Sequence, residues 1–109
     1  MAEEMKVLGQ QAPGAATLTP LYTVPGGKKA AVSSVVICNR GGTATVFRIS
    51  LAVAGAADAV KQYLYYDIPI AANDTFVATI GITLDATDVL RCYAGNANLS
   101  FNALGVEIS

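Results

Sequence analysis

Histidine and tryptophan are both missing from this chain of 109 residues, and it contains only two cysteines. Without histidine, no Ser-His-Asp or Cys-His catalytic group can form, and none of the histidine-containing metal sites can be built. Two cysteines are too few for a structural zinc site, which takes four ligands. Acid/base chemistry would have to rest on carboxylates alone, and several aspartates lie in turn sequences, where they bond the backbone. The sequence therefore predicts no enzyme activity, no cofactor and no bound metal.

Charge is also scarce. Charged residues make up 14% of the chain and the mean hydropathy is +0.47, whereas soluble domains typically carry about 25% charged residues. Seven basic and eight acidic residues give a net charge of -1, with Lys28 and Lys29 as the one adjacent basic pair. No basic face can form, so we expect no nucleic-acid partner.

So apolar a subunit must cover its exterior, either in a membrane or against other subunits. Thr, Ser, Asn and Gly interrupt the apolar runs before any reaches the ~18 residues of a spanning helix, so we expect no membrane partner. The first six residues, MAEEMK, contain two acids rather than the basic start of a signal peptide. These patterns predict a homo-oligomer made in a cytoplasm.

Cys38 and Cys92 lie in apolar surroundings and are expected to be buried thiols. A disulfide is the alternative, and it requires their Cα atoms to lie within about 7 Å. A reducing site of synthesis disfavours that bond without excluding it.

Turn residues divide the chain into short alternating or β-branched segments, which predict an all-β fold. So many short strands without a covering helix are best accommodated by an antiparallel β-sandwich of jelly-roll type. In residues 43–53, the alternation directs one set of side chains inward: Thr45, Phe47, Ile49, Leu51 and Val53. The expected strands are 17–24, 29–39, 43–53, 62–68, 76–83, 89–94 and 99–108.

Residues 1–16 contain few large apolar side chains and are expected to form an extended N-terminal arm, with residues 17–109 as the β-sandwich domain. Edge strands of a sandwich need protection, and an arm that pairs with a neighbouring subunit would supply it. Lys6, Val7 and Leu8 in this arm are therefore candidate interface residues.

The tyrosine cluster in residues 62–68 is the other candidate. Alternation places Tyr63 and Tyr65 on one face, and Tyr66 on the other face with Leu64 and Ile68. We interpret Tyr66 as a core residue, and Tyr63 and Tyr65 as interface residues, because tyrosine is enriched at interfaces. The alternative is a carbohydrate-binding platform, since tyrosine rings pack against apolar faces and keep a polar tip.

Four segments carry a resemblance to a known group of proteins: KVLGQQAP at 6–13, LYTVPGGKKAAVSSVVICNRG at 21–41, YLYYDIPIAANDTF at 63–76 and IGITLDATDVLRCYAG at 80–95. They resemble small virion structural proteins encoded in the structural gene clusters of tailed bacteriophages, over nearly the whole chain. The resemblance implies a capsid decoration (cement) protein, a neck or collar component, or a fibre-associated protein. It transfers no catalytic or binding residues.

A cement protein stabilises a shell by mass action, because many copies bind one assembled state. The resemblance thus implies a virion location after synthesis in the host cytoplasm, with the major capsid or neck proteins as partners. Shell symmetry would favour a trimer. A carbohydrate-binding module displayed on the virion is the alternative function.

Overall fold

Eight strands and two single-turn 3₁₀ helices make up the regular structure in a computed structural model that describes residues 2–109. The 3₁₀ helices, η1 (Val53–Gly55) and η2 (Val60–Gln62), both lie in the connection between β4 and β5. The strands are β1 (Glu3–Gln11), β2 (Thr19–Thr23), β3 (Lys29–Asn39), β4 (Thr45–Ala52), β5 (Tyr63–Ile70), β6 (Thr75–Leu84), β7 (Val89–Ala94) and β8 (Leu99–Ile108).

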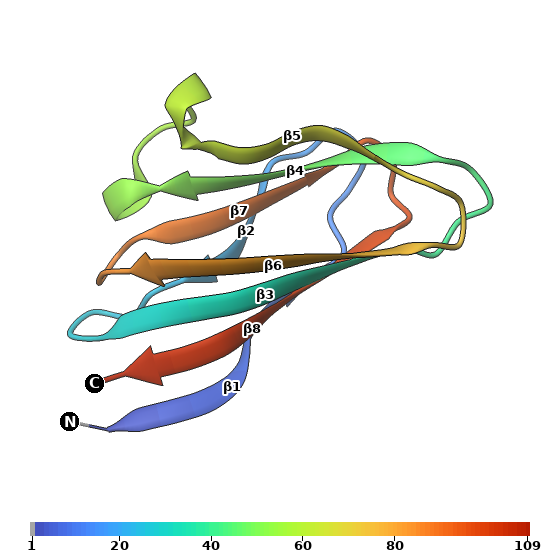
Figure 1. The fold of residues 1–109 in the computed structure, drawn as a ribbon. Coiled ribbons are helices and arrows are strands. Elements are labelled where there is room, and N and C mark those ends of the chain that lie inside the picture. Colours follow the sequence, from blue (N-terminus) through green and yellow to red (C-terminus); the bar gives the residue numbers. More distant parts are fainter. Residues whose placement is uncertain (1) are drawn as a thin grey trace.

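The strands form two four-stranded sheets with the orders β1-β8-β3-β6 and β2-β7-β4-β5, one above the other in Figure 1. Each strand of the first half of the chain pairs antiparallel with a strand of the second half: β1 with β8, β2 with β7, β3 with β6, and β4 with β5. The predicted all-β class and antiparallel β-sandwich are therefore confirmed.

A buried asparagine fixes one end of the sandwich. Asn39 ends β3, and its Nδ2 donates hydrogen bonds to the carbonyl oxygens of Thr43, at 2.9 Å, and Ala71, at 3.1 Å. Its Oδ1 accepts a bond from the backbone N–H of Gly41 at 3.0 Å. One amide thus joins the turn after β3 to the turn between β5 and β6. This is the side-chain-to-backbone bonding that makes asparagine a turn residue.

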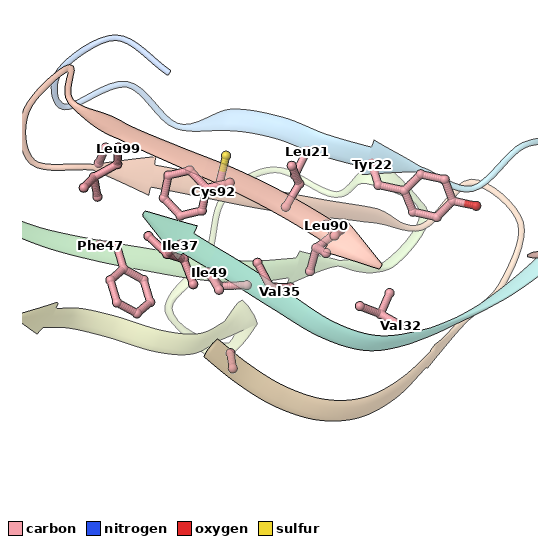
Figure 2. Close-up of a cluster of buried hydrophobic side chains, with 14 of the residues drawn as sticks. Leu21, Tyr22, Val32, Val35, Ile37, Phe47, Ile49, Leu90, Cys92 and Leu99 are labelled. Carbon is pink, nitrogen blue, oxygen red and sulfur yellow. The ribbon is translucent and has the colours of Figure 1, made fainter. Parts of the chain in front are cut away.

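The core lies between the sheets, as Figure 2 shows, and three phenylalanine rings pack against one another within it. Phe47 from β4 is fully buried, and its ring centroid lies 5.2 Å from that of Phe76 and 6.4 Å from that of Phe101. Cys92 is buried in the same cluster, whereas Cys38 is half-buried, and both are free thiols. The expected burial of both thiols therefore holds for Cys92, whereas Cys38 is less buried than expected.

The predicted inward face of residues 43–53 holds for the length of β4. Phe47 and Ile49 are fully buried, and Leu51 packs against the core. Val53 is an exception, with 67% of its surface exposed, because β4 ends at Ala52 and η1 begins at Val53. The alternation rule applies only as far as the strand extends.

The N-terminal segment is extended, as expected, but it lies within the sandwich. Residues 3–11 form β1, which pairs with β8 from Glu3 opposite Ile108 to Gln11 opposite Phe101. Gly9 allows this approach, because a Cβ there would overlap the carbonyl group of Leu21 in β2. The segment therefore closes one side of the sandwich as an edge strand.

Candidate functional site

The outward surface of the sheet β1-β8-β3-β6, here called the A face, is almost free of charge. The strand register sets Met5 opposite Val106, Val106 opposite Ala31, and Ala31 opposite Thr83. Met5 is 85% exposed, although a methionine side chain is apolar. By strand alternation, the outward residues between the two sheet ends are Met5, Val7, Gln10, Ala31, Ser34, Val36, Cys38, Thr75, Val77, Thr79, Gly81, Thr83, Ser100, Asn102, Leu104 and Val106.

Charge on the A face is confined to one end of the sheet. There, Glu3 lies opposite Ile108, and Ile108 lies opposite Lys29. The rest of the face presents valine, leucine, methionine, alanine, threonine, serine and amide side chains. Large exposed apolar patches mark interaction sites, and this face combines exposed apolar residues, Met5, Val7 and Val77, with uncharged polar ones.

The outward surface of the other sheet, the B face, contains a charged and aromatic cluster. Arg48 in β4 donates from Nε to Oδ1 of Asp67 at 2.6 Å. Its Cζ lies 4.1 Å from the ring centroid of Tyr66 and 4.3 Å from that of Tyr93. A guanidinium at this distance from two rings makes favourable cation–π contacts. The hydrogen bond that Arg48 donates to Asp67 raises the pKa of Arg48, and a guanidinium is charged at any ordinary pH.

A hollow of about 420 Å³ opens beside this cluster. Tyr63 and Tyr66 line it with their rings perpendicular and 5.0 Å apart. The Tyr63 hydroxyl donates to Oδ2 of Asp58 at 3.1 Å, and partial burial, followed by this bond, raises the pKa of Tyr63. The remaining lining comes from Arg48, Ala59 and Val60. Aromatic surface and hydrogen-bonding groups therefore converge on one depression.

Alternation places Tyr66 and Leu64 in the core and Tyr65 on the opposite face, and the structure reverses these sides. Tyr66 is 55% exposed, and Leu64 is also exposed, so neither belongs to the core. Tyr65 instead packs toward the core, with its ring centroid 6.2 Å from that of Phe47. The cause is an irregularity in β5, where Asp67 has a φ of 50°. Ile68 then returns to the core side, opposite Phe47.

The five candidate interface residues therefore do not form one surface. Val7 points outward on the A face, and Tyr63 lines the hollow on the B face. Lys6 turns toward Glu107, whereas Leu8 and Tyr65 pack against the core. An interface role for these residues stays a prediction. Tyr93 was not identified from the sequence as part of the B-face cluster. Alternation in residues 89–94 nevertheless places its side chain on the other face of the strand from Leu90 and Cys92.

A buried carboxylate joins three strands at the closed side of the sandwich. Glu107 in β8 is only 5% exposed, and it accepts hydrogen bonds from the Tyr22 hydroxyl at 2.6 Å and from Lys6 Nζ at 3.0 Å. Lys28 Nζ lies 3.6 Å away. These bonds, that of Tyr22 first, lower the pKa of Glu107, and burial raises the pKa of Tyr22. Every polar partner is satisfied, which indicates a structural role.

Within residues 2–109, no three side chains among cysteine, aspartate and glutamate gather closely enough to hold a metal ion. The same residues contain no helix with the length and apolar character needed to cross a membrane.

No model of a known protein family matches this sequence, and no curated protein matches it either. Among solved structures, it is similar to two crystal structures of a pentameric capsid protein isolated from metagenomic phage sequences. The first is 16% identical with a TM-score of 0.35, and the second is 14% identical with a TM-score of 0.27. The match covers 95% of this chain in both cases, but only 63% and 67% of those chains. These values are too low to transfer a role.

Proposed function

We propose that this chain is a non-enzymatic structural protein of a bacteriophage particle, and specifically a capsid decoration (cement) protein. The observation that carries the proposal is the uncharged A face. The sequence resemblance to small structural proteins of tailed phages suggests that the particle is a phage virion. The A face suggests how the chain binds, because a subunit that lies flat on a shell removes that face from water.

The size of the A face suits this role. Four strands spaced about 4.8 Å apart, each presenting about eight residues at roughly 3.3 Å per residue, give an area of about 500 Å². Contact of this size with one partner buries about 1,000 Å² in total, near the lower limit of a specific interface. A cement protein does not need a large interface, because many copies act together on one shell.

The fold supports the same reading. We infer a jelly roll, because the chain pairs its first four strands with its last four in the order β1 with β8 through to β4 with β5. A two-sheet jelly roll of this kind occurs in capsid domains and in lectins. The fold alone therefore does not separate a shell subunit from a carbohydrate-binding module.

A matched pair of valine substitutions tests the proposal. Val36→Lys places a charge on the A face, and Val46→Lys places the same charge on the opposite side, next to Arg48. Particles of the phage that encodes this chain are prepared with its gene deleted and are then mixed with each purified protein. Bound protein is measured by mass spectrometry, and shell stability by the temperature of DNA release.

We expect the natural chain and Val46→Lys to bind and to raise the release temperature, and Val36→Lys to bind at least about tenfold more weakly. Absence of the chain from natural virions would refute the proposal. Equal binding by Val36→Lys would remove the A face as its basis. Copies restricted to a single vertex would favour the neck or collar alternative over decoration.

The hollow on the B face favours one second candidate, a carbohydrate-binding module. Sugars stack their C–H faces on aromatic rings and bond to fixed polar groups, and Tyr63, Tyr66 and Asp58 supply both kinds of contact. Glycan-array binding that Tyr66→Ala abolishes and Tyr22→Phe leaves intact would support this function. An array without any bound glycan would oppose it.

A further inference from the structure

The four edge strands of the sandwich are protected to very different degrees. Edges expose unpaired N–H and C=O groups, and natural proteins shield them with charge, proline or bulges. β1 carries three charged residues and a register shift after Val7. β2 contains Pro20 and a register shift next to it, and β5 contains both Asp67 and Pro69.

β6 lies at the remaining edge and contains no charge or proline, and its one irregularity is a register shift against β3 between Thr79 and Ile82. Its sequence, TFVATIGITL, combines ten uncharged residues rich in β-branched side chains. Alternate residues of an antiparallel edge strand direct both backbone groups away from the sheet, so about half of β6 offers free donors and acceptors. An exposed segment of this composition is an aggregation hazard unless another strand covers it.

The apolar packing beside β6 is also incomplete. Seven apolar residues pack against the core while remaining only partly buried, and five of them come from β5 and β6. The five are Tyr65, Ile68, Phe76, Ile80 and Ile82. On the opposite side, β2 contributes Leu21 and Tyr22, which are both buried. The sandwich is therefore closed at β1 and β2 and open at β5 and β6.

The occupant best matched to this edge is a second copy of the chain. The other three edges are protected, so the unprotected partner available in an assembly of identical subunits is β6 itself. An antiparallel pairing centred on Thr79 sets Thr79 opposite Thr79 of the second copy. It also sets Val77 opposite Gly81 and Phe76 opposite Ile82. Outward residues thus meet outward residues, inward apolar residues meet inward ones, and no charges oppose each other.

The open side is large enough for such a contact. A ten-residue strand is about 34 Å long, and the smallest extent of the molecule is 19 Å. Their product, roughly 650 Å² per copy, is an upper limit for this side, so two copies would bury at most about 1,300 Å², which reaches the range of specific interfaces.

We propose that β6 pairs antiparallel with β6 of a second copy, around a two-fold axis at Thr79, and so joins two four-stranded sheets into one of eight strands. This inference deepens the proposed function, in which many copies bind one shell, by naming a contact between copies. The contact is isologous and gives a dimer, in contrast to the trimer that shell symmetry favours.

The test compares two threonine substitutions on edge strands. Thr79→Lys brings two lysines together at the proposed axis, whereas Thr23→Lys places the same exposed charge on the edge strand β2 of the other sheet. Molecular mass is measured by sedimentation equilibrium up to about 100 µM, a range that detects dimers of micromolar Kd. Circular dichroism melts establish that each variant is folded.

We expect the natural chain and Thr23→Lys to be dimers, and Thr79→Lys to be a monomer with an unchanged melting transition. If Thr79→Lys does not fold, Gly81→Lys replaces it, because a Cβ at Gly81 meets no other atom within 4 Å. A natural chain that stays monomeric, or an oligomer that both β6 variants leave intact, would overturn the inference.

The outcome is separable from that of the proposed function. Val36→Lys alters the centre of the A face and should dimerise normally while losing shell binding. A dimer absent from virions would leave the β6 contact standing and refute the decoration role. A monomer that binds shells would support the decoration role and refute the β6 contact.

Discussion

Replacing Glu107 with glutamine tests the contact that joins β1, β2 and β8 at the closed side of the sandwich. The substitution keeps the size of the side chain and removes its charge. The Tyr22 hydroxyl then donates to a neutral amide oxygen instead of a carboxylate, and Lys6 and Lys28 lose their shared anion. The fold should survive with lower stability.

The magnitude follows from the Tyr22 bond. A hydrogen bond to a charged group contributes about 1.5–3 kcal/mol net, and a neutral one about 0.5–1.5 kcal/mol. The difference is roughly 1.5 kcal/mol, since Glu107 is almost fully buried. The lysine side chains are 38% and 40% exposed, so water screens their attraction and adds little to the difference. At about 4 °C per kcal/mol for a domain of this size, Tm should fall by about 6 °C.

The loss should depend on pH with a definite sign. The fold holds the pKa of Glu107 below its ordinary value of 4.5, so its contribution is complete above that pH and is lost as the pH falls through the lower folded pKa. Calorimetric melts of Glu107→Gln and the natural chain should therefore differ at pH 7 and converge as the pH falls below 4.5 and through the lower folded pKa. Asp85→Asn, which removes an exposed ion pair with Lys29, is the control and should leave Tm unchanged. Equal melting of Glu107→Gln and the natural chain at pH 7, or a gap that persists at acid pH, would refute the reasoning.

Two further substitutions probe the edges of the sandwich by urea denaturation. Gly9→Ala should lower the free energy of unfolding by about 1–3 kcal/mol, because the new Cβ would overlap a backbone carbonyl of β2. Gly42→Ala is the control, since a Cβ there meets nothing within 4 Å. Equal effects of the two substitutions would contradict the close approach of β1 to β2. Arg48→Met should cost about 1 kcal/mol through loss of its two ring contacts and the bond to Asp67, and should change the near-ultraviolet dichroism of the tyrosines. Unchanged dichroism would place Arg48 away from the rings in solution.

Local chemistry was sufficient to predict the sandwich and much of its interior. Phe47 and Ile49 were assigned to the core from a period of two, and both are fully buried. The expected strand 29–39 matches β3, and Asn39 at its end bonds two separate turns. These features depend on residues a few positions apart, where strand alternation and turn preferences act directly.

The candidate site was harder to predict because β5 is irregular. Alternation through residues 62–68 assumes a regular strand, but β5 shifts register against β4 twice, between Tyr63 and Tyr65 and again between Tyr65 and Ile68, where Asp67 has a positive φ. Tyr66 therefore joins Arg48 on the B face, and Tyr65 enters the core. Aspartate adopts a positive φ more readily than most residues, but most aspartates do not adopt it, so Asp67 alone does not mark the irregularity.

The other difference from the sequence prediction is the place of residues 1–16 in the sheet, and contacts between distant residues account for it. Lys6 and Glu107 are separated by 101 positions, and no periodicity relates them. Residues 1–16 looked unsuited to a core because most of their side chains are small or polar. Their place in the sheet comes from β8, which offers a free edge along its whole length.

Deleting residues 1–16 decides whether this segment is an arm or an integral strand. The sandwich should stay folded, because β8 keeps its pairing with β3, and Glu107 keeps Tyr22 and Lys28. Tm should fall, because β8 becomes an edge, and shell binding should weaken as β1 leaves the A face. Self-association through β6 should persist, since β1 and β6 are opposite edges of one sheet. A truncated chain without a cooperative melting transition would instead make β1 indispensable and move the domain boundary to the start of the chain.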